Sequence, residues 1–418
     1  MALRVHSGAV EPLREGPTPP SAQVVVVGGG VMGLAAADEL ARAGADVLLL
    51  ERDRLGRGSS AKPFGGVRGT FSDPGNIALG LRGLERYAAL HEAVPGGIGL
   101  ARVGYLFCAR THGQALAVEA STALQRSMGA EVDVVSPARA AELNPHLDPS
   151  ALVAASFSPR DGYAEPGRVV AAWAASAAER GARVVEGAEV TGVEVHDDGA
   201  GARVTAVRYR AGGPGGPECE VRCEHLVVAT GAWSARVGAL AGVDLPVEPV
   251  RRQIAFADAP GGARGSVGAG GRPLPFTLDL STTFYVHGSP DGLLLGISDP
   301  AQAPGFGRDY DDSWVAAFDA AAAEVAPGLV GLPLRRGWAG LYENTPDHNA
   351  LIGASREVAG LVYATGFSGH GFLQAPAVGE VVRDLVLGRE PLVDVAPFSA
   401  ERFAPRSAAP LLQEVHII

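Results

Sequence analysis

The sequence predicts an α/β fold in which a parallel sheet built around a glycine-rich turn is joined to a second, α+β domain with a largely antiparallel sheet. Three observations predict it. A β-branched run at 23–27 leads into a glycine-rich turn and then a helical pattern. Buried strands return at 225–230 and 361–364. Between these returns, from Pro246 to Ile297, alternating strands are separated by glycine and proline clusters, as expected of an antiparallel sheet.

The composition describes a globular chain of 418 residues, long enough for about two domains. The net charge of −11 is diffuse, and the absence of a basic block predicts no nucleic-acid partner. Cys108, Cys219 and Cys223 imply neither a disulfide framework nor a metal site, because they are odd in number and have no nearby histidine. The valine run at 24–27 is too short to span a bilayer, so we expect a cytoplasmic protein without a membrane span. The oligomeric state stays open.

The first elements form a βαβ unit. The strand at 23–27 is followed by a helix that places Leu34, Ala37 and Leu40 inward, and Gly44 ends that helix. A second buried strand at 45–50 follows, so the whole unit spans about 30 residues.

The later elements follow from the same two periodicities. In the segment 78–93, for example, Leu81, Leu84, Tyr87 and Leu90 share one helical stripe. Helices are predicted at 78–93, 116–128, 137–143, 169–180, 312–325 and 377–387; strands at 104–108, 183–186, 225–230 and 361–364; and a hairpin at 190–196 with 203–210.

These elements divide into two discontinuous domains between two tails. The nucleotide-binding domain is predicted at 22–105, 151–240 and 335–405, and the substrate domain at 106–150 and 241–334. Residues 1–21, which carry four prolines, and residues 406–418 are predicted as terminal tails.

The turn after the first strand fits the pattern G-x-G-x-x-G over Gly28, Gly30 and Gly33, with Val31 and Met32 at the x positions. The first glycine makes the tight turn, the second lets the backbone approach a pyrophosphate, and the third lets helix and strand pack. The helix N-terminus supplies unpaired N–H groups to the phosphates. About 20 residues on, Glu51 is placed to accept hydrogen bonds from the adenosine ribose.

NAD and FAD share this turn, so other segments decide the cofactor. The segment LVVATGAW at 226–233 is a strand that returns to the nucleotide, with Thr230, Gly231 and Trp233 at its end. LVYATGFSGHGF at 361–372 repeats the strand and turn near the C-terminus. A nicotinamide dehydrogenase has no use for the second return, so the pattern favours FAD.

Two further motifs carry a family resemblance. TPDHNALIG at 345–353 is followed by TGFSGHGFLQAPAVGE at 365–380. Together with the glycine turn, they resemble the D-amino-acid oxidase superfamily of FAD-dependent oxidoreductases, in the branch of sarcosine oxidases, glycine oxidase, and proline and dimethylglycine dehydrogenases. The resemblance covers 23–403. It implies a Rossmann-type FAD-binding domain and a substrate domain whose sheet covers the flavin.

The resemblance also implies a reaction. It is oxidation of a C–N bond in an amine or amino acid, with a secondary or N-methylated amino acid as the expected substrate class. Hydride passes to flavin N5, and the imine then hydrolyses. Oxygen and another electron carrier are both kept as acceptors.

The resemblance assigns the site residues. Arg68 is expected to bind the substrate carboxylate, because a guanidinium fork fixes both its charge and its orientation. His370 is expected to add positive charge beside the reduced flavin, and Tyr285 and His287 to line the substrate pocket, with Tyr342 and Asn344 as weaker candidates. The residues expected to contact FAD are Gly28, Gly30, Val31, Met32, Gly33, Glu51, Arg52, Ser59, Ser60, Val190, Thr230, Gly231, Trp233, Gly366, Gly369, His370, Gly371 and Phe372.

The sequence departs from sarcosine oxidases at three positions. Leu373 and Leu294 stand where those enzymes have lysines that bind the carboxylate and activate oxygen, and the chain's one lysine, Lys62, offers no obvious substitute. Gly340 stands where they attach the flavin through cysteine, so FAD is expected to be non-covalent. The alternatives are an amino-acid dehydrogenase that passes electrons to a carrier other than oxygen, a non-catalytic FAD-binding assembly protein, and an aromatic-ring monooxygenase, which the TGFSGHG turn disfavours.

Overall fold

The computed structural model describes residues 20–197, 199, 201–260, 267–268, 271–290, 292–404 and 414. Residues 1–19 of the predicted N-terminal tail lie outside the described residues. So does the predicted C-terminal tail, apart from Glu414.

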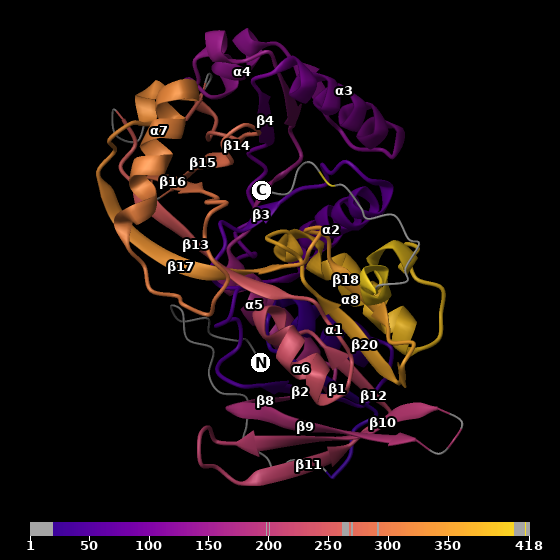
Figure 1. Ribbon diagram of the computed structural model, residues 1–418. Helices are drawn as coiled ribbons and strands as arrows, with labels where there is room; N and C mark the ends of the chain where they lie inside the picture. The colour runs from indigo at the N-terminus through magenta and orange to yellow at the C-terminus, as the bar shows by residue number, and fades with distance from the viewer. Residues whose placement is uncertain are drawn as a thin grey trace.

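A six-stranded sheet forms the lower part of the molecule (Figure 1). All neighbouring strands are parallel except the first pair, so the carboxyl ends of the central strands share one edge. In spatial order the strands are β18 (Leu351–Ala354), β20 (Leu361–Thr365), β12 (His225–Val228), β1 (Val24–Val27), β2 (Val47–Glu51) and β8 (Arg183–Glu186). Valines at 24–27 are almost fully buried because both faces of the sheet are covered.

Helices and a second sheet cover these two faces. One core packs the sheet against α1 (Val31–Arg42), α8 (Gly371–Val386), α5 (Pro166–Glu179) and α2 (Pro74–Ala93). The other core includes the predicted hairpin, which forms β9 (Ala188–Asp197) and β10 (Ala202–Ala211) with β11 (Glu218–Arg222) and β19 (Val358–Ala359), together with α6 (Ser234–Leu240).

An eight-stranded sheet forms the upper part (Figure 1). Its one parallel contact joins β14 to β4, and its other neighbours are antiparallel, as predicted for the substrate domain. The strands in spatial order are β17 (Leu334–Asn344), β13 (Glu248–Ala257), β16 (Gly292–Ile297), β15 (Phe284–Ser289), β14 (Phe276–Asp279), β4 (Tyr105–Ala109), β6 (Ala154–Ser158) and β5 (Asp133–Val135). Its outer layer includes α7 (Val315–Val325), α3 (His112–Ser127) and α4 (Pro137–Leu143).

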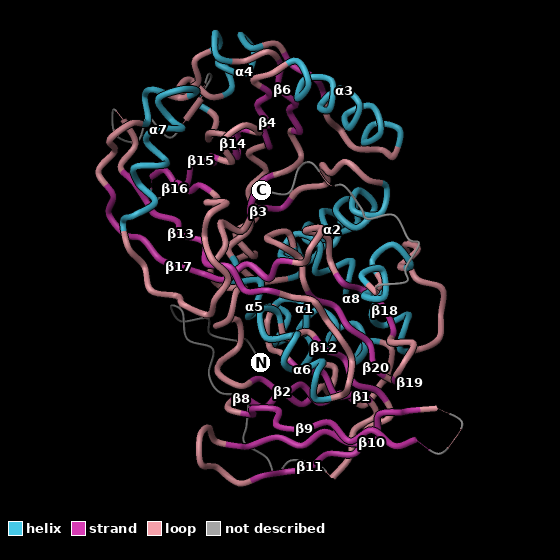
Figure 2. The backbone as a smooth tube through the Cα atoms, in the orientation of Figure 1, coloured by secondary structure: helices cyan, strands magenta, loops and turns pink. Residues whose placement is uncertain are grey.

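Two strands of this sheet come from segments assigned to the nucleotide-binding domain. They are β6, within 151–240, and β17, which lies within 335–405 except for its first residue. Sequence alone did not separate them because their partners lie far along the chain: β6 pairs with β4, and β17 pairs with β13. A two-stranded pair, β3 (Gly66–Val67) with β7 (Gly162–Tyr163), lies between the two parts (Figure 1, Figure 2).

Helix α8 begins at Gly371, six residues before its predicted start at Ala377. The prediction placed the start after Pro376, which lies inside the helix. Proline has no N–H to bond the carbonyl of Phe372 four residues earlier. The Tyr87 hydroxyl donates to that carbonyl instead, at 2.5 Å. The buried hydroxyl thus compensates for the proline and ties α2 to the first turn of α8.

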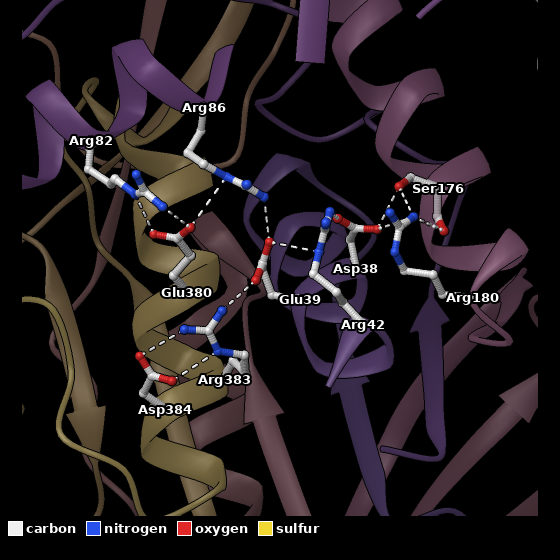
Figure 3. A network of polar contacts seen from close by, with 10 residues as sticks. All are labelled: Asp38, Glu39, Arg42, Arg82, Arg86, Ser176, Arg180, Glu380, Arg383 and Asp384. Atoms are coloured by element: carbon white, nitrogen blue, oxygen red, sulfur yellow. Dashed lines mark hydrogen bonds and ion pairs between the residues drawn. The ribbon is translucent and has the colours of Figure 1, made fainter. Parts of the chain in front are cut away.

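A charge network joins α1, α2 and α8 (Figure 3). At its centre Glu39, 3% exposed, contacts Arg42, Arg86 and Arg383. A second carboxylate, from Glu380, receives two N–H groups of Arg82 at 2.8 and 2.9 Å. The other members drawn are Asp38, Ser176, Arg180 and Asp384. These ion pairs hold α8 against α1 and α2 in addition to the apolar core that the three helices share.

No helix within the described part of the chain combines the length and apolar character that crossing a membrane requires.

Candidate cofactor and substrate site

A cavity of about 600 Å³ runs from the glycine turn after β1 to the inner face of the eight-stranded sheet. Its walls come from the carboxyl ends of β1, β2 and β12 on one side and from β13, β14, β15 and β17 on the other. Ligands of open parallel sheets bind outside the carboxyl ends of the strands, so its position fits a nucleotide at one end and a smaller molecule at the other.

The glycine turn is shaped by close backbone contacts. Gly28 has φ +110, and a Cβ there would lie 2.8 Å from the carbonyl carbon of Ala229. A Cβ on Gly33 would overlap the carbonyl group of Gly28, so this glycine lets α1 pack onto the turn, as predicted. Gly30 has ordinary extended angles and a different role, because a Cβ there would meet only Ser60. It keeps the cavity side of the turn open.

The N-terminus of α1 opens onto this cavity beside Ser60. No side chain of Gly30 can cap the helix, and the Ser60 hydroxyl accepts the N–H of Val31 at 2.9 Å. Val31 and Met32 also line the cavity, and the neighbouring Ser59 hydroxyl is buried without a hydrogen-bond partner among the described residues. Main-chain N–H groups and an unsatisfied hydroxyl here suit an anionic group such as a pyrophosphate.

Glu51 lies at the end of β2, as the pattern predicts. Its two carboxylate oxygens accept the N–H groups of Gly29 at 2.6 Å and Asp53 at 2.8 Å. Burial raises the pKa of Glu51, and the two main-chain bonds act in the opposite direction. Because each carboxylate oxygen can accept more than one hydrogen bond, Glu51 can fix the turn and still bind a ribose hydroxyl.

The two strand returns meet beside the turn. The hydroxyls of Thr230, Ser234 and Thr365 form a chain, with separations of 2.9 and 2.6 Å, that joins the ends of β12 and β20. Val190, Thr230, Gly231 and Trp233 line the cavity, and the Arg52 guanidinium lies 4.3 Å from the Trp233 ring centre. The structure therefore brings these predicted cofactor contacts together at one end.

Gly369, His370, Gly371 and Phe372 line the cavity at the start of α8. Gly366 is not among the lining residues that the structure describes. Its φ of +69 and the closeness of Thr345, which a Cβ would contact, show that this glycine is needed for the backbone turn after β20.

His370 is buried, and neither ring nitrogen has a hydrogen-bond partner among the described residues. Its ring lies edge-on to Phe71 and Phe367. Burial, followed by the charge of Arg68, lowers its pKa well below the ordinary value. In the protein alone, an apolar enclosure beside a fixed cation disfavours the imidazolium, and the positive charge expected of His370 beside the reduced flavin stays a prediction. A neutral imidazole facing the cavity can donate one hydrogen bond and accept another.

The far end of the cavity has an aromatic and aliphatic wall, which sequence reasoning missed except for Tyr285. Tyr105 and Phe276 stack with ring centres 4.4 Å apart, and Ile254 and Leu278 continue the surface. Tyr285 fits because Gly296 opposite has no side chain: a Cβ there would lie 2.5 Å from its ring. These residues come from four strands that share a face only after folding.

His287 is not among the lining residues in the described chain. Its ring is stacked against Phe276 at 4.9 Å and Tyr163 at 4.8 Å, and Phe64 lies edge-on at 5.4 Å. Its Nδ1 lies 2.9 Å from the carbonyl oxygen of Gly288, and burial lowers its pKa to about 4. The aromatic rings separate it from the cavity, and the weaker candidate Asn344 is likewise absent from the described lining.

Arg68 follows β3 and lines the cavity with only 5% of its surface exposed. It donates to the carbonyl of Thr70, and its guanidinium lies 4.0 Å from the ring centre of Phe71. The next turn is held by buried Asp161, which accepts the N–H of Gly69 at 3.2 Å and the Thr70 hydroxyl at 3.1 Å. Burial raises the pKa of Asp161 to about 6. Arg68 is therefore a positioned, largely desolvated cation near the aromatic wall of the cavity.

Two ionisable residues that the sequence did not place here also line the cavity. Glu343, at the end of β17, accepts the N–H groups of Gly366 and Phe367, and burial raises its pKa to about 7. Lys62 lines the cavity beside Gly340, where a Cβ would lie 2.9 Å from the lysine Cβ. The chain's one lysine thus lies in the same cavity as the predicted cofactor contacts.

Comparisons with known proteins agree with a two-domain dinucleotide-binding oxidoreductase. Residues 23–385 match the DAO family, described as FAD dependent oxidoreductase. FAD-dependent oxidoreductase domain-containing protein 1 from Bos taurus is 30% identical over 431 residues, which cover 92% of this chain and 85% of that protein. Glycine oxidase from Geobacillus kaustophilus is 30% identical over 389 residues, covering 91% and 96%. The crystal structure of L-proline dehydrogenase from P. horikoshii matches with a TM-score of 0.83 at 29% identity, covering 93% and 100%.

The chain therefore belongs to the DAO family of FAD-dependent oxidoreductases. The predicted family, fold class, oxidoreductase activity and FAD cofactor are confirmed.

The residues of the cavity fit FAD. The glycine turn and the N-terminus of α1 would hold the pyrophosphate, and Glu51 the adenosine ribose. The start of α8 would lie against the flavin ring, where His370 supplies two unsatisfied ring nitrogens.

Proposed function

We propose that this protein oxidises a C–N bond of a secondary or N-methylated amino acid, the flavin of FAD taking up hydride from the carbon next to nitrogen. The observation that carries the proposal is Arg68, a buried guanidinium that lines the cavity beside the wall of Tyr105, Phe276 and Tyr285. A fork of N–H donors with apolar surface next to it suits a carboxylate attached to a small organic group.

The chain's own residues would bind and orient the substrate. Arg68 fixes the carboxylate, the aromatic wall excludes water from the reacting carbon, and neutral His370 can hydrogen-bond at the flavin end. The substrate must bind as the free amine, because its nitrogen lone pair is needed to form the imine. Water then hydrolyses the imine to a carbonyl compound and an amine. The glycine oxidase and L-proline dehydrogenase among the similar proteins support an amino-acid substrate.

An anaerobic flavin-bleaching screen tests this function. Purified holoenzyme is mixed without oxygen with N-methyl, cyclic and D-amino acids, and loss of flavin absorbance is recorded. We expect at least one amino acid to bleach the flavin, and Arg68→Gln to lower kcat/KM for it roughly 100-fold, as loss of a charge-assisted bidentate contact. If no amine bleaches the flavin, the proposed amino-acid substrate class is refuted.

The electron acceptor is tested on the same enzyme. With the substrate from the screen, hydrogen peroxide formation is compared with reduction of an artificial dye. Peroxide at the rate of amine consumption supports an oxidase. Rapid dye reduction without peroxide supports a dehydrogenase that passes electrons to another carrier.

We also propose that FAD is held without a covalent bond. Gly340 has no side chain to attach it, and Lys62 lies directly beside this position. Heat or acid precipitation should therefore leave the flavin in the supernatant. Flavin that stays with the precipitated protein would contradict this.

A further inference from the structure

Arg252 is a second cation in the wall of the same cavity. It lies in the middle of β13, where it pairs in register with Gly340 of β17, and it lines the cavity together with Ile254 two residues further on. The two neighbours of Arg252 along the strand, Arg251 and Gln253, point to the opposite face. Arg251 binds Asp311 there at 2.7 Å, and Gln253 accepts the N–H of Asp311 at 2.8 Å.

Among the residues that the structure describes, no carboxylate pairs with Arg252. One of its terminal nitrogens donates to the carbonyl oxygens of Arg251 at 3.2 Å and Asp299 at 3.4 Å, and neither acceptor carries a charge. Its Nε is buried with no acceptor, and Arg252 forms no ion pair with a carboxylate within the described residues. Neighbouring Arg251, by contrast, forms an ion pair with Asp311. A partly buried cation of this kind is stabilised by an anion that enters the cavity.

Arg252 and Arg68 act on the same residue, Tyr342. The guanidinium carbon of Arg252 lies 5.3 Å from the centre of the Tyr342 ring. Burial raises the pKa of the Tyr342 phenol, and the charges of Arg252 and Arg68 both oppose that rise. The phenol also lines the cavity, so two cations from different elements surround one part of it. A substrate with a single carboxylate can pair with only one of them.

We infer that Arg252 forms an anion subsite and that the preferred substrates carry a second carboxylate in addition to the one bound by Arg68. The inference rests on the proposed oxidation of an amino acid in this cavity. The substrate class is thus an N-substituted amino dicarboxylic acid, whose side-chain carboxylate replaces the missing anionic partner of Arg252. The surrounding Ile254 and Tyr285 would strengthen this pairing by excluding water.

A matched pair of substrates tests the inference. N-methylaspartate and N-methylalanine differ by the side-chain carboxylate alone, and N-methylasparagine replaces that carboxylate with a neutral amide. Each is supplied as both enantiomers, and the anaerobic rate of flavin reduction is measured with wild-type holoenzyme, Arg252→Gln and Arg252→Lys. Arg251→Gln is the matched control, because it removes a charge from the adjacent position on the opposite face of the strand.

We expect kcat/KM for N-methylaspartate to exceed that for the other two compounds at least tenfold. Arg252→Gln should bring the ratio of kcat/KM for N-methylaspartate to that for N-methylalanine close to one, because the loss falls mainly on N-methylaspartate. Arg252→Lys should restore part of the preference, and Arg251→Gln should keep all of it.

Three outcomes would overturn the inference, and they are distinguishable. Equal wild-type rates with N-methylaspartate and N-methylalanine would show that no second carboxylate is recognised, while the proposed oxidation stands. Equal losses on all compounds in Arg252→Gln, with a lower flavin reduction potential in the free enzyme, would assign Arg252 to the cofactor. Reduction by none of the compounds, nor by any amine of the wider screen, would refute the proposed function itself.

Discussion

Replacing Gly30 with alanine tests whether the glycine turn is built for a closely bound pyrophosphate. The backbone of Gly30 has φ −78 and ψ 179, angles that alanine adopts without strain, so the substitution adds bulk and little else. The new Cβ would lie 2.8 Å from the Ser60 hydroxyl oxygen and would project toward the cavity. Crowding of this size costs about 1–3 kcal/mol, which corresponds to a loss of roughly 5- to 150-fold in FAD affinity.

The assay is titration of apoprotein with FAD, followed by flavin fluorescence. Ser60→Ala provides the decisive background, because without the hydroxyl the added Cβ has no close protein neighbour: the Ser60 Cβ is 4.0 Å away. We expect Gly30→Ala still to weaken FAD binding in this background. Gly113→Ala, where nothing lies within 4 Å of the added carbon, should leave affinity unchanged. If the loss disappears in the Ser60→Ala background, Gly30 makes room for Ser60 and not for the cofactor.

Three further predictions concern the stability of the holoenzyme in urea. Burial raises the pKa of Glu343 from 4.5 to about 7, so its stabilising protonated form is complete below pH 4.5 and lost as pH rises through 7. The stability of Glu343→Gln relative to wild type should therefore rise by about 3 kcal/mol between pH 4 and pH 8, and parallel pH profiles would contradict this. Glu39→Gln leaves three arginines without their shared carboxylate and should lower the free energy of unfolding by about 3 kcal/mol. The control Glu85→Gln, at an exposed pair, should change it by under about 0.5 kcal/mol. Equal losses in the two variants would refute the central role of Glu39 in the network. Tyr87→Phe should lower the free energy of unfolding by about 1–3 kcal/mol, because it leaves the buried Phe372 carbonyl without a donor. The loss should be clearly smaller in a Pro376→Ala background, because the alanine N–H can replace the hydroxyl. An equal loss in both backgrounds would rule out this compensation.

Local patterns predicted the elements that carry the nucleotide site. The strand, turn and helix of the glycine motif lie within a few residues of one another, so their geometry depends on neighbours that the sequence shows directly. The structure has β1 at Val24–Val27 and α1 from Val31, and Glu51 ends β2 as expected.

Helix starts were less predictable where a proline lies near the boundary. Helix α2 begins at Pro74, four residues before the predicted position, because Asp73 caps it by accepting the N–H of Asn76. Helix α8 continues through Pro376 because a distant tyrosine satisfies the freed carbonyl. The aspartate–proline cap was readable in the sequence, but the tyrosine contact was not.

The substrate end could be predicted only in part. Arg68 and Tyr285 were assigned through the resemblance, but Tyr105, Ile254 and Phe276 lie on three other strands whose order in the sheet no local pattern shows. The protonation state of His370 likewise depends on its burial and on Arg68, which come from the folded environment and not from the motif.

The role of Arg68 in binding the substrate carboxylate is tested with the best amino acid from the screen and its carboxamide, which has the same shape without the charge. Anaerobic stopped-flow reduction is measured for both compounds with wild-type enzyme and with Arg68→Gln. We expect a preference for the acid of roughly 100-fold in wild type and its near-complete loss in the variant. An undiminished preference in Arg68→Gln would contradict the assignment of Arg68 as the residue that binds the substrate carboxylate.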